Sequence, residues 1–518
     1  MCGIVGYIGN REAQPILVNA LKRLEYRGYD SCGTAVSASA IQLHKDIGRI
    51  AQLEETMPLT SARKGVGHTR WATHGKPSKL NAHPHLDCTG EIAVVHNGVI
   101  DNYQSLREQL IKEGHIFHSE TDTEVVSHLI EKHLRDNFKE AVRRALLEIE
   151  GSYAIIALHA YRHELIVARK ESPLILGLGD NETFIASDAP AILDYTDRVV
   201  YLEDGDIALI TTGNIQITNG DEEVKRDEHK ITWNIEDAQK GGYDHFMIKE
   251  IHEQPRVIAN TLRGHISAID NQVDLGITID KELNDIFMVA CGTSYYASLV
   301  GKWLIENLAE IPVRVEMASE FNYSKPIVDK TWSIGITQSG ETADTLMALK
   351  KASALGCSTL AITNVVGSTA TRITDQTFFI KAGPEISVAA TKSFIGQLVA
   401  LYMLAISLAN GNAKYREILV SELRQLPGKV EQLLENKQPI MDCSKYIAKQ
   451  QNMFFIARGI NYPIALEGAL KMKEISYINA EGYAAGELKH GPFALLTPGV
   501  PVLAIVAKDE TYNTMLAN

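Results

Sequence analysis

The second half of this 518-residue chain repeats a pattern of apolar strand, small-residue turn and helix, and this repeat restricts the possible folds more than any other feature. The segments FMVACGTSYYASLVG and FFIARGINYPIALEG each carry two glycines at the same spacing. These are Gly292 and Gly301 in the first copy and Gly459 and Gly468 in the second. Strands that alternate with helices form parallel sheets with crossover helices. The sequence therefore predicts two α/β modules of doubly wound type, the second incomplete at Asn518.

The first half of the chain has a different pattern. Short β-rich runs such as IAVVHNGVI and SYAIIALHA are mixed with helical segments such as TEVVSHLIEKHL, which predicts an α+β domain. A charged stretch without a periodic apolar face follows and predicts a connecting segment. The expected organisation is a first domain over residues 2–218, a linker over 219–245, a first α/β module over 246–425 and a partial second module over 440–518.

Charge and cysteine usage exclude several classes of protein. The formal net charge is −13 and no basic block is present, which argues against a nucleic-acid partner. The six cysteines have neither CxxC nor His–Cys spacing, so we expect no metal site and no disulfide framework. The most apolar stretch, SFIGQLVALYMLAISLAN, contains Gln397 and is shorter than the ~20 residues of a membrane span. We expect a cytoplasmic protein with no membrane partner.

Cys2 directly follows the initiator methionine. If Met1 is removed, Cys2 carries both a thiol and an α-amine with an ordinary pKa of about 8, which can take the proton of the thiol. The alternative is a small apolar residue at the start of a strand. The motifs EYRGYDS, GHTRWATHG, NAHPH, VVHNGVI and SETDTE follow in this order, and with Cys2 they resemble the glutaminase domains of class II glutamine amidotransferases. The resemblance implies an αββα sandwich of the N-terminal-nucleophile (Ntn) type.

This resemblance implies a role for each matched residue. Cys2 attacks the carboxamide carbon of glutamine, which gives a γ-glutamyl thioester and releases ammonia. Asn97 and Gly98 hold the oxyanion by a side-chain amide and a backbone N–H. Arg70 binds the α-carboxylate of glutamine, and Asp122 binds its α-ammonium group.

The same resemblance places Thr73 and His74 in the glutamine-binding loop and makes Trp71 the gate of the ammonia path. The residues alone leave other interpretations open. Asn-Gly is a tight-turn dipeptide. Asp122 is suited to cap the helix that follows it, and Trp71 to be an ordinary half-buried aromatic residue.

Two turns of the second half, CGTSYY and TQSGETAD, place hydroxyl residues between a buried strand and a helix start. Backbone N–H groups at such positions bind anions, and both turns would lie at the carboxyl edge of one parallel sheet. The sequence thus predicts a phosphate-ester site, although plain helix caps would give the same pattern. The turns and the repeat resemble the sugar isomerase (SIS) fold of phosphosugar enzymes. The resemblance implies that the sugar phosphate is bound by Thr293, Ser294, Gln338, Ser339 and Thr342.

Glu467, Lys471 and Glu474 recur at i, i+4 and i+7, so they share one face of a helix. A solvated row of ion pairs would have the same spacing. Together with the following GELKHGP, the stretch resembles the isomerase module of amino-sugar synthases. In that family Glu474 moves a proton between C1 and C2 of the sugar, and Lys471 and Glu467 assist. His490, by itself a typical surface residue, would open the sugar ring from the neighbouring subunit, which implies a homodimer.

Together the two halves resemble the glutamine–fructose-6-phosphate aminotransferase (isomerising) family. The resemblance implies transfer of the amide nitrogen of L-glutamine to fructose 6-phosphate, without metal or organic cofactor. Family members continue beyond the position of Asn518, so we expect an incomplete acceptor site and at most glutaminase activity from these residues. The alternative is a non-catalytic phosphosugar sensor or a partner-dependent fragment.

Overall fold

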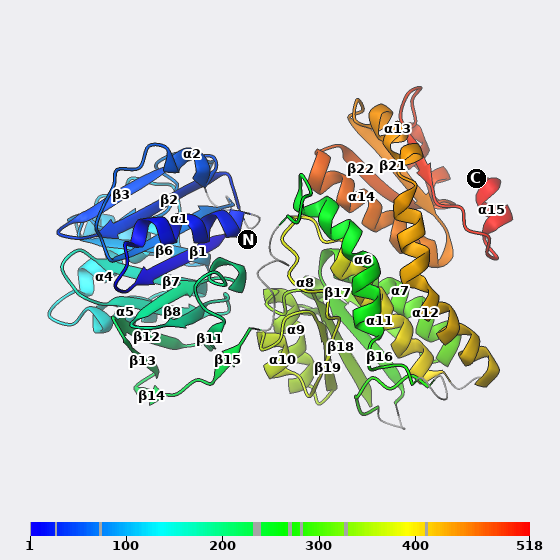
Figure 1. Cartoon of the computed structure of the whole chain (residues 1–518), viewed down its shortest axis with the longest axis horizontal. Coiled ribbons are helices and arrows are strands. Elements are labelled where there is room, and N and C mark those ends of the chain that lie inside the picture. The colour runs from blue at the N-terminus through cyan, green and yellow to red at the C-terminus, as the bar shows by residue number, and fades with distance from the viewer. Residues whose placement is uncertain are drawn as a thin grey trace. The chain divides into compact units, whose positions relative to one another are not determined.

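The structure is a computed structural model that describes residues 2–25, 28–71, 75–231, 240–267, 272–279, 283–325, 330–409 and 413–518. The chain divides into two compact units, residues 1–235 and 236–518 (Figure 1). The division falls inside the charged segment 219–245, but that segment also contains two short strands that pair within the first unit. They are β14 (Glu222–Val224) and β15 (Glu228–Lys230).

Two antiparallel sheets form the centre of the first unit. In spatial order, the first contains β15, β11 (Arg198–Tyr201), β9 (Ile175–Gly179), β10 (Glu182–Ala186), β1 (Gly3–Ile8), β4 (Lys64–Arg70), β2 (Ser31–Ser37) and β3 (Ile41–Ile47). The second contains β14, β13 (Asn214–Asn219), β12 (Asp206–Thr211), β8 (Leu165–Lys170), β7 (Gly151–His159), β6 (Ile92–Ile100) and β5 (His85–Leu86).

Helices cover the outer faces of both sheets. One core joins α1 (Ala13–Leu24) and α2 (Ile50–Glu54) to the first sheet. Another joins α3 (Tyr103–Lys112), α4 (Glu124–His133) and α5 (Phe138–Leu147) to the second. A third core lies between the sheets and includes Ile4, Val66 and Val95. The unit is therefore the expected αββα sandwich, because each strand alternates between an inter-sheet and a helix-facing side chain.

The second unit begins with α6 (Phe246–Leu262) and a five-stranded parallel sheet. The strand order is β17 (Val313–Met317), β16 (Asp285–Ala290), β18 (Thr331–Thr337), β19 (Ser358–Thr363) and β20 (Gln376–Phe379). The helices are α7 (Gly292–Ala309), α8 (Ala318–Phe321), α9 (Ala343–Ala354), α10 (Thr369–Ile373), α11 (Lys392–Leu408), α12 (Ala413–Glu435) and α13 (Gln438–Ile447). This is the predicted α/β module with crossover helices.

The second module repeats the start of the first on a smaller scale. Its parallel strands, in spatial order, are β22 (Asn479–Ala484), β21 (Asn452–Ala457) and β23 (Val502–Ala504), accompanied by α14 (Tyr462–Ser476) and α15 (Tyr512–Leu516). Gly292 and Gly459 follow the equivalent strands β16 and β21 with φ of 52° and 55°. A left-handed backbone at both positions requires glycine and confirms the internal repeat.

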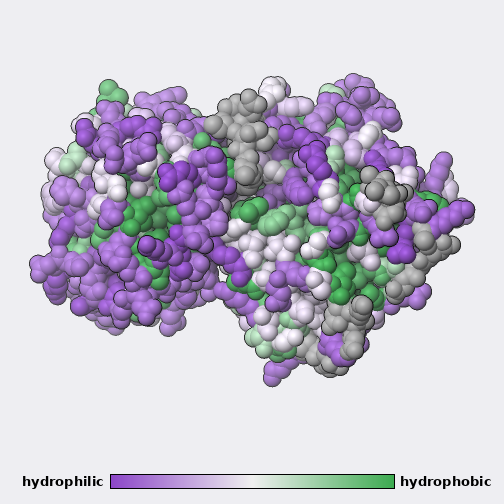
Figure 2. Space-filling model, turned by 60° about the horizontal axis from the view of Figure 1, so that its bottom comes forward, coloured by the Kyte–Doolittle hydropathy of each residue, from purple (hydrophilic) through white to green (hydrophobic). Residues whose placement is uncertain are grey.

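The most apolar stretch of the chain forms α11, which packs against α6 and α7. Buried residues occur all around this helix, which confirms the predicted interior helix. Among the described residues, we find no helix with the length and apolarity needed to cross a bilayer. On the face seen in Figure 2, polar side chains dominate the first unit, and larger apolar areas reach the surface of the second.

Candidate functional site

Strand alternation brings the predicted glutaminase residues to one layer. Ile4 and Val66 belong to the core between the two sheets, so even-numbered positions of β1 and β4 face that core. Cys2 directly precedes β1 and is also an even-numbered position. His68 and Arg70 are even-numbered positions of β4. Since β1 and β4 pair with Gly3 opposite Thr69, these three residues lie at the same end of the sandwich.

Cys2 is held by the backbone of the residue that follows β4. Its Sγ lies 3.2 Å from the Trp71 nitrogen, which donates to it, and 3.5 Å from the Trp71 oxygen. Desolvation raises the pKa of the thiol, and the Trp71 N–H and the nearby Arg70 charge oppose this rise. A hydrogen-bond donor aimed at the sulfur stabilises a thiolate in a site that otherwise disfavours charge.

Asn97 lies on β6 at an odd-numbered position, as does Val95 of the inter-sheet core. Its Nδ2 donates to the Cys2 oxygen at 2.8 Å. Its Oδ1 lies 3.0 Å from Nε2 of His68, which is also 3.0 Å from the His96 oxygen. Two acceptors around one nitrogen require that nitrogen to carry the proton, so His68 donates to Oδ1 and directs the amide NH₂ of Asn97 toward Cys2.

Burial keeps this histidine neutral. Desolvation lowers the pKa of His68 to about 3, and its ring stacks on His83 with centroids 4.2 Å apart. Its role as a positioning residue was not apparent from the sequence, because GHTRWATHG does not show which strand His68 faces.

Gly98 has φ +128°, and a Cβ built there would lie 2.1 Å from the Ser152 oxygen. The dipeptide Asn97–Gly98 is not a turn, since it lies inside β6 opposite Ala154 and Tyr153 of β7. The structure thus corrects the tight-turn interpretation: glycine is needed here for its backbone angle and for close strand approach.

Arg70 and Asp122 are both buried. Nη2 of Arg70 donates to the Gly75 oxygen at 3.1 Å. Asp122 is not the cap of α4, because that position belongs to Thr123, and Asp122 Oδ2 instead accepts from the Ile100 N–H at 3.0 Å. Its carboxylate is thereby held at the end of the strand that carries Asn97.

Trp71 is 42% exposed and meets Tyr29 edge to face, with ring centroids 5.6 Å apart. This partial exposure is compatible both with a gating side chain and with an ordinary half-buried aromatic residue. Thr73 and His74 lie outside the described residues.

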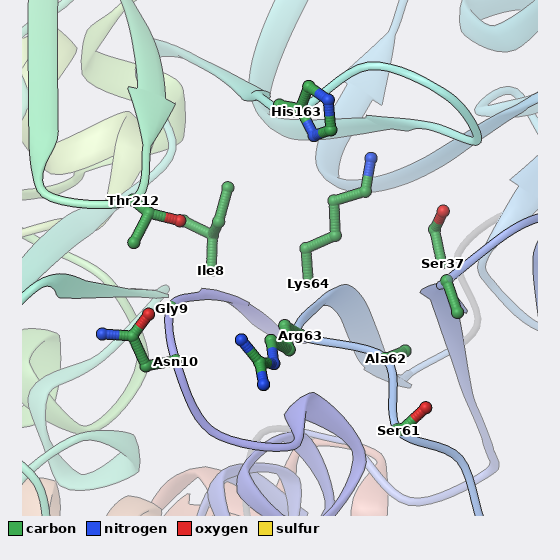
Figure 3. Close-up of a pocket in the computed structure, with 11 residues that line it drawn as sticks. Ile8, Gly9, Asn10, Ser37, Ser61, Ala62, Arg63, Lys64, His163 and Thr212 are labelled. Atoms are coloured by element: carbon green, nitrogen blue, oxygen red, sulfur yellow. The ribbon is translucent and has the colours of Figure 1, made fainter.

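A polar pocket of about 360 Å³ lies at the opposite end of β1 and β4 (Figure 3). Ile8 and Lys64, which line it, are register partners at that end. Lys64 Nζ donates to the His159 oxygen at 2.7 Å, and desolvation lowers the pKa of this lysine to about 8. The pocket therefore does not belong to the group around Cys2.

In the second unit, the hydroxyl turns follow neighbouring strands. β16 and β18 pair in parallel, and α7 and α9 begin directly beyond them. Ser294 Oγ accepts from Nε2 of the buried Gln397 at 3.0 Å. This contact explains the polar residue inside α11, which the sequence shows only as an interruption.

The second turn is ordered by its own side chains. Thr337 Oγ1 lies 3.0 Å from Thr342 Oγ1 and accepts from the Gly340 N–H, and Ser339 Oγ accepts from the Glu341 N–H at 3.1 Å. The backbone of Gln338 accepts from the Asn364 N–H at 3.1 Å. Thr342 occupies the N-cap position of α9 without a side-chain cap hydrogen bond, so a plain capping role does not account for its hydroxyl.

One polar network links the two modules. Thr293 Oγ1 donates to Glu467 Oε1 at 3.1 Å and accepts from Lys471 Nζ at 3.0 Å. Lys471 also pairs with Glu474 at 2.6 Å. Glu467 is buried, and desolvation raises its pKa to about 7 against the opposing effects of Lys471 and Thr293. The row is thus a partly buried network rather than a solvated one, and Glu467 is poised to exchange a proton near neutral pH.

His490 ends a short 3-10 turn (Glu487–Lys489), and its side chain is exposed. His490 is thus accessible to solvent, whereas Glu467 is buried.

Comparisons with known proteins agree with this division of the chain. A family model described as "SIS domain" matches residues 281–407 and 446–518, and one described as "Glutamine amidotransferase domain" matches residues 68–194. The glutamine–fructose-6-phosphate aminotransferase (isomerizing) of Methanosarcina mazei is 47% identical over 542 residues, covering 100% of this chain and 88% of the relative. The corresponding protein of Thermococcus kodakarensis is 49% identical over 532 residues, with the same coverage.

Among solved structures, the C-terminal domain of glucosamine-fructose-6-phosphate aminotransferase from Francisella tularensis is similar to this chain. Its TM-score is 0.52 at 40% identity, and the similarity covers 54% of this chain and 81% of that one.

Proposed function

Since the chain belongs to the family of glutamine–fructose-6-phosphate aminotransferases (isomerizing), we propose that it transfers the amide nitrogen of L-glutamine to fructose 6-phosphate and isomerises the ketose to the aldose. The products are glucosamine 6-phosphate and glutamate, which places the enzyme in amino-sugar biosynthesis. The observation that carries the proposal is the set of groups around Cys2: a backbone donor on its sulfur and an amide oriented by a buried histidine.

In the first half-reaction, the thiolate of Cys2 attacks the side-chain carbonyl carbon of glutamine. The amine exposed by removal of Met1 takes the thiol proton and returns it to the leaving nitrogen. Asn97 Nδ2 and the Gly98 N–H hold the negative oxygen, Arg70 binds the α-carboxylate, and Asp122 the α-ammonium group. Water then hydrolyses the thioester and releases glutamate.

For the remaining glutamine contacts, we assign Thr73 and His74 to the substrate loop and Trp71 to the gate that admits ammonia to the acceptor. The exposed ring of Trp71 supports its assignment, because a gating side chain must be able to move.

In the second half-reaction, the phosphate of fructose 6-phosphate lies over the starts of α7 and α9. Its ligands are Thr293, Ser294, Gln338, Ser339 and Thr342. Two helix starts at adjacent strand ends support this placement. Proton transfer between C1 and C2 is assigned to Glu474, with Lys471 and Glu467 holding the sugar.

The exposed His490 supports a homodimer in which the ring-opening histidine comes from the partner subunit. A cytoplasmic location agrees with the chemistry, since both substrates are small polar metabolites and the proposed nucleophile is a reduced thiol. The alternative of a non-catalytic sensor is not favoured, because the chain matches its relatives over its whole length.

The test uses the full-length protein and measures glutamate and glucosamine 6-phosphate together. Cys2→Ala should abolish both products, whereas Cys443→Ala, which removes an exposed cysteine of the second unit, should leave both unchanged. A glutamine-analogue electrophile should add once, to Cys2 with Met1 removed. Retained Met1, no adduct and no product would support the sensor instead.

A further inference from the structure

Four potential metal ligands converge at a place that the glutaminase mechanism does not use. They are Cys88, His115, His128 and Glu131, and one ligand atom from each lies within 4.8 Å of all the others. Cys88 follows β5, His115 follows α3, and the other two lie on α4. The cysteine is exposed and His128 is buried, so the cluster is open to ions from solvent and anchored in the core.

Four of the six distances between the ligand atoms are close to those of a tetrahedral zinc site. Cys88 Sγ lies 3.4 Å from His128 Nδ1 and 3.6 Å from His115 Nδ1. Glu131 Oε2 lies 3.3 Å and 3.0 Å from the same two nitrogens. Zinc bonds of about 2.3 Å to sulfur and about 2.0–2.2 Å to nitrogen and oxygen, at tetrahedral angles, separate the ligand atoms by about 3.4–3.6 Å. Shifts of a few tenths of an ångström bring these four distances into that range.

The buried environment of His128 supplies a second, independent observation. Its Nε2 is buried without a hydrogen-bond partner and lies 3.9 Å from Oε1 of Glu124. A proton on Nε2 would point toward that carboxylate and would leave the Nδ1 lone pair directed at Cys88 and Glu131. This is the tautomer that a metal-bound histidine adopts, with a carboxylate behind the ring.

We propose that Cys88, His115, His128 and Glu131 form a closed structural site for a divalent zinc ion. One thiolate, two imidazoles and one carboxylate suit zinc better than magnesium or calcium, which prefer oxygen ligands. Because protein atoms fill all four positions, the ion has a structural role. It joins the β5–β6 turn, the segment after α3 and helix α4, which begins two residues after Asp122. The zinc thus stabilises helix α4 next to Asp122, which is proposed to bind the α-ammonium group of glutamine. Only this consequence rests on the proposed function.

The sequence did not predict this site, because Cys88 and His115 are 27 residues apart and lack a standard zinc spacing. The only local signal is His128 and Glu131 at i and i+3, which places them on one face of a helix.

The experiment uses full-length protein without a histidine tag, in a Cys2→Ala background that removes the other thiol of the first unit close to solvent. We expect about one zinc per chain by mass spectrometry after equilibration with zinc and gel filtration. Substitution with Co²⁺ should produce a thiolate-to-cobalt charge-transfer band. Cys88→Ser should abolish that band and lower zinc affinity at least about 10–100-fold, the range seen even for outer partners of metal ligands. Cys443→Ser and His118→Ala, which alter exposed residues outside the cluster, should change neither.

A second measurement needs no variant of the cluster. Zinc should slow alkylation of Cys88 and leave alkylation of the exposed Cys443 in the same chain unchanged. Equal alkylation of Cys88 with and without zinc, absence of the cobalt band, or unchanged zinc affinity in Cys88→Ser would overturn the proposal.

Discussion

At the scale of single residues, the groups around Cys2 show how a buried histidine can set the direction of an amide. His68 donates to Asn97 Oδ1, so Nδ2 is left to point toward Cys2, to whose backbone oxygen it donates at 2.8 Å. A donor fixed before charge develops stabilises an oxyanion without reorganisation, which is the source of its catalytic effect.

We therefore predict that Asn97→Ala lowers kcat for glutamine hydrolysis by about 10²–10³-fold with little change in KM. His68→Ala should act in the same direction but less strongly, because the amide is still present although no longer oriented. Glutamate release measures both effects. Asn214→Ala, an exposed asparagine on β13, is the control. A large rise in KM with unchanged kcat for Asn97→Ala would contradict the oxyanion role.

Glu467 gives a prediction about pH. Desolvation raises the pKa of its carboxyl from 4.5 to about 7 in the folded chain, so the folded state binds a proton that the unfolded state has lost between these values. The free energy of unfolding should therefore fall as the pH rises from about 4.5 to about 7, by at most about 3 kcal/mol. Glu467→Gln imitates the protonated form and should remove this fall, since Lys471 keeps its pairing with Glu474.

Thermal unfolding of the second unit, followed from pH 5 to pH 8, measures the difference. Glu487→Gln removes an exposed carboxylate of the same module and should keep the wild-type slope. Parallel pH curves for wild type and Glu467→Gln would show that Glu467 ionises normally.

At the scale of elements, the close approach of strand β7 requires a glycine at position 98 of strand β6. A Cβ at Gly98 would meet the Ser152 backbone oxygen at 2.1 Å, whereas a Cβ at Gly90 has no atom within 4 Å, although its φ is also positive, at +72°. An alanine at position 90 would therefore experience backbone strain alone, whereas an alanine at position 98 would also clash with the Ser152 backbone.

Gly90→Ala should cost about 1 kcal/mol, as expected for strain alone. Gly98→Ala should cost several times more and should also lower glutaminase activity, because β6 and β7 must move apart at the proposed oxyanion site. Chemical unfolding of the first unit and glutamate release give the two quantities. Equal stability losses at both positions would contradict the clash.

Sequence patterns predicted local elements well and long-range placement poorly. Helix α4, strands β6 and β7 and the β16–α7 unit follow from periodicity, because each depends on a face buried within one segment. The tight-turn interpretation of Asn97–Gly98 was wrong because pairing with β7 outweighs the local preference of the dipeptide.

The sequence also did not predict which polar groups are buried. The raised pKa of Glu467 depends on its enclosure beside Thr293, far away in the chain, and the orientation of Asn97 depends on His68 from another strand. The i, i+4, i+7 spacing shows that three charges share a helix face, but it does not show which of them is removed from water.

At the scale of the whole molecule, each unit has its own apolar cores. The three apolar clusters described in the first unit contain residues between Ile4 and Ile231. The largest apolar cluster of the second unit begins at Val257. A unit with its own core can unfold as a cooperative body, so two heat-absorption transitions are expected from the full-length protein.

Ligands should distinguish the two transitions. Reaction of Cys2 with a glutamine-analogue electrophile should raise the transition of the first unit only, and fructose 6-phosphate that of the second only. A ligand that binds only the folded state adds about 2.7 kcal/mol at 100 times its Kd, which is readily measured by calorimetry. Two variants identify the transitions. Gly98→Ala should lower the transition of the first unit, and Glu467→Gln should remove the pH dependence of the transition of the second unit. A single transition that both ligands raise equally would show instead that the two units unfold as one body.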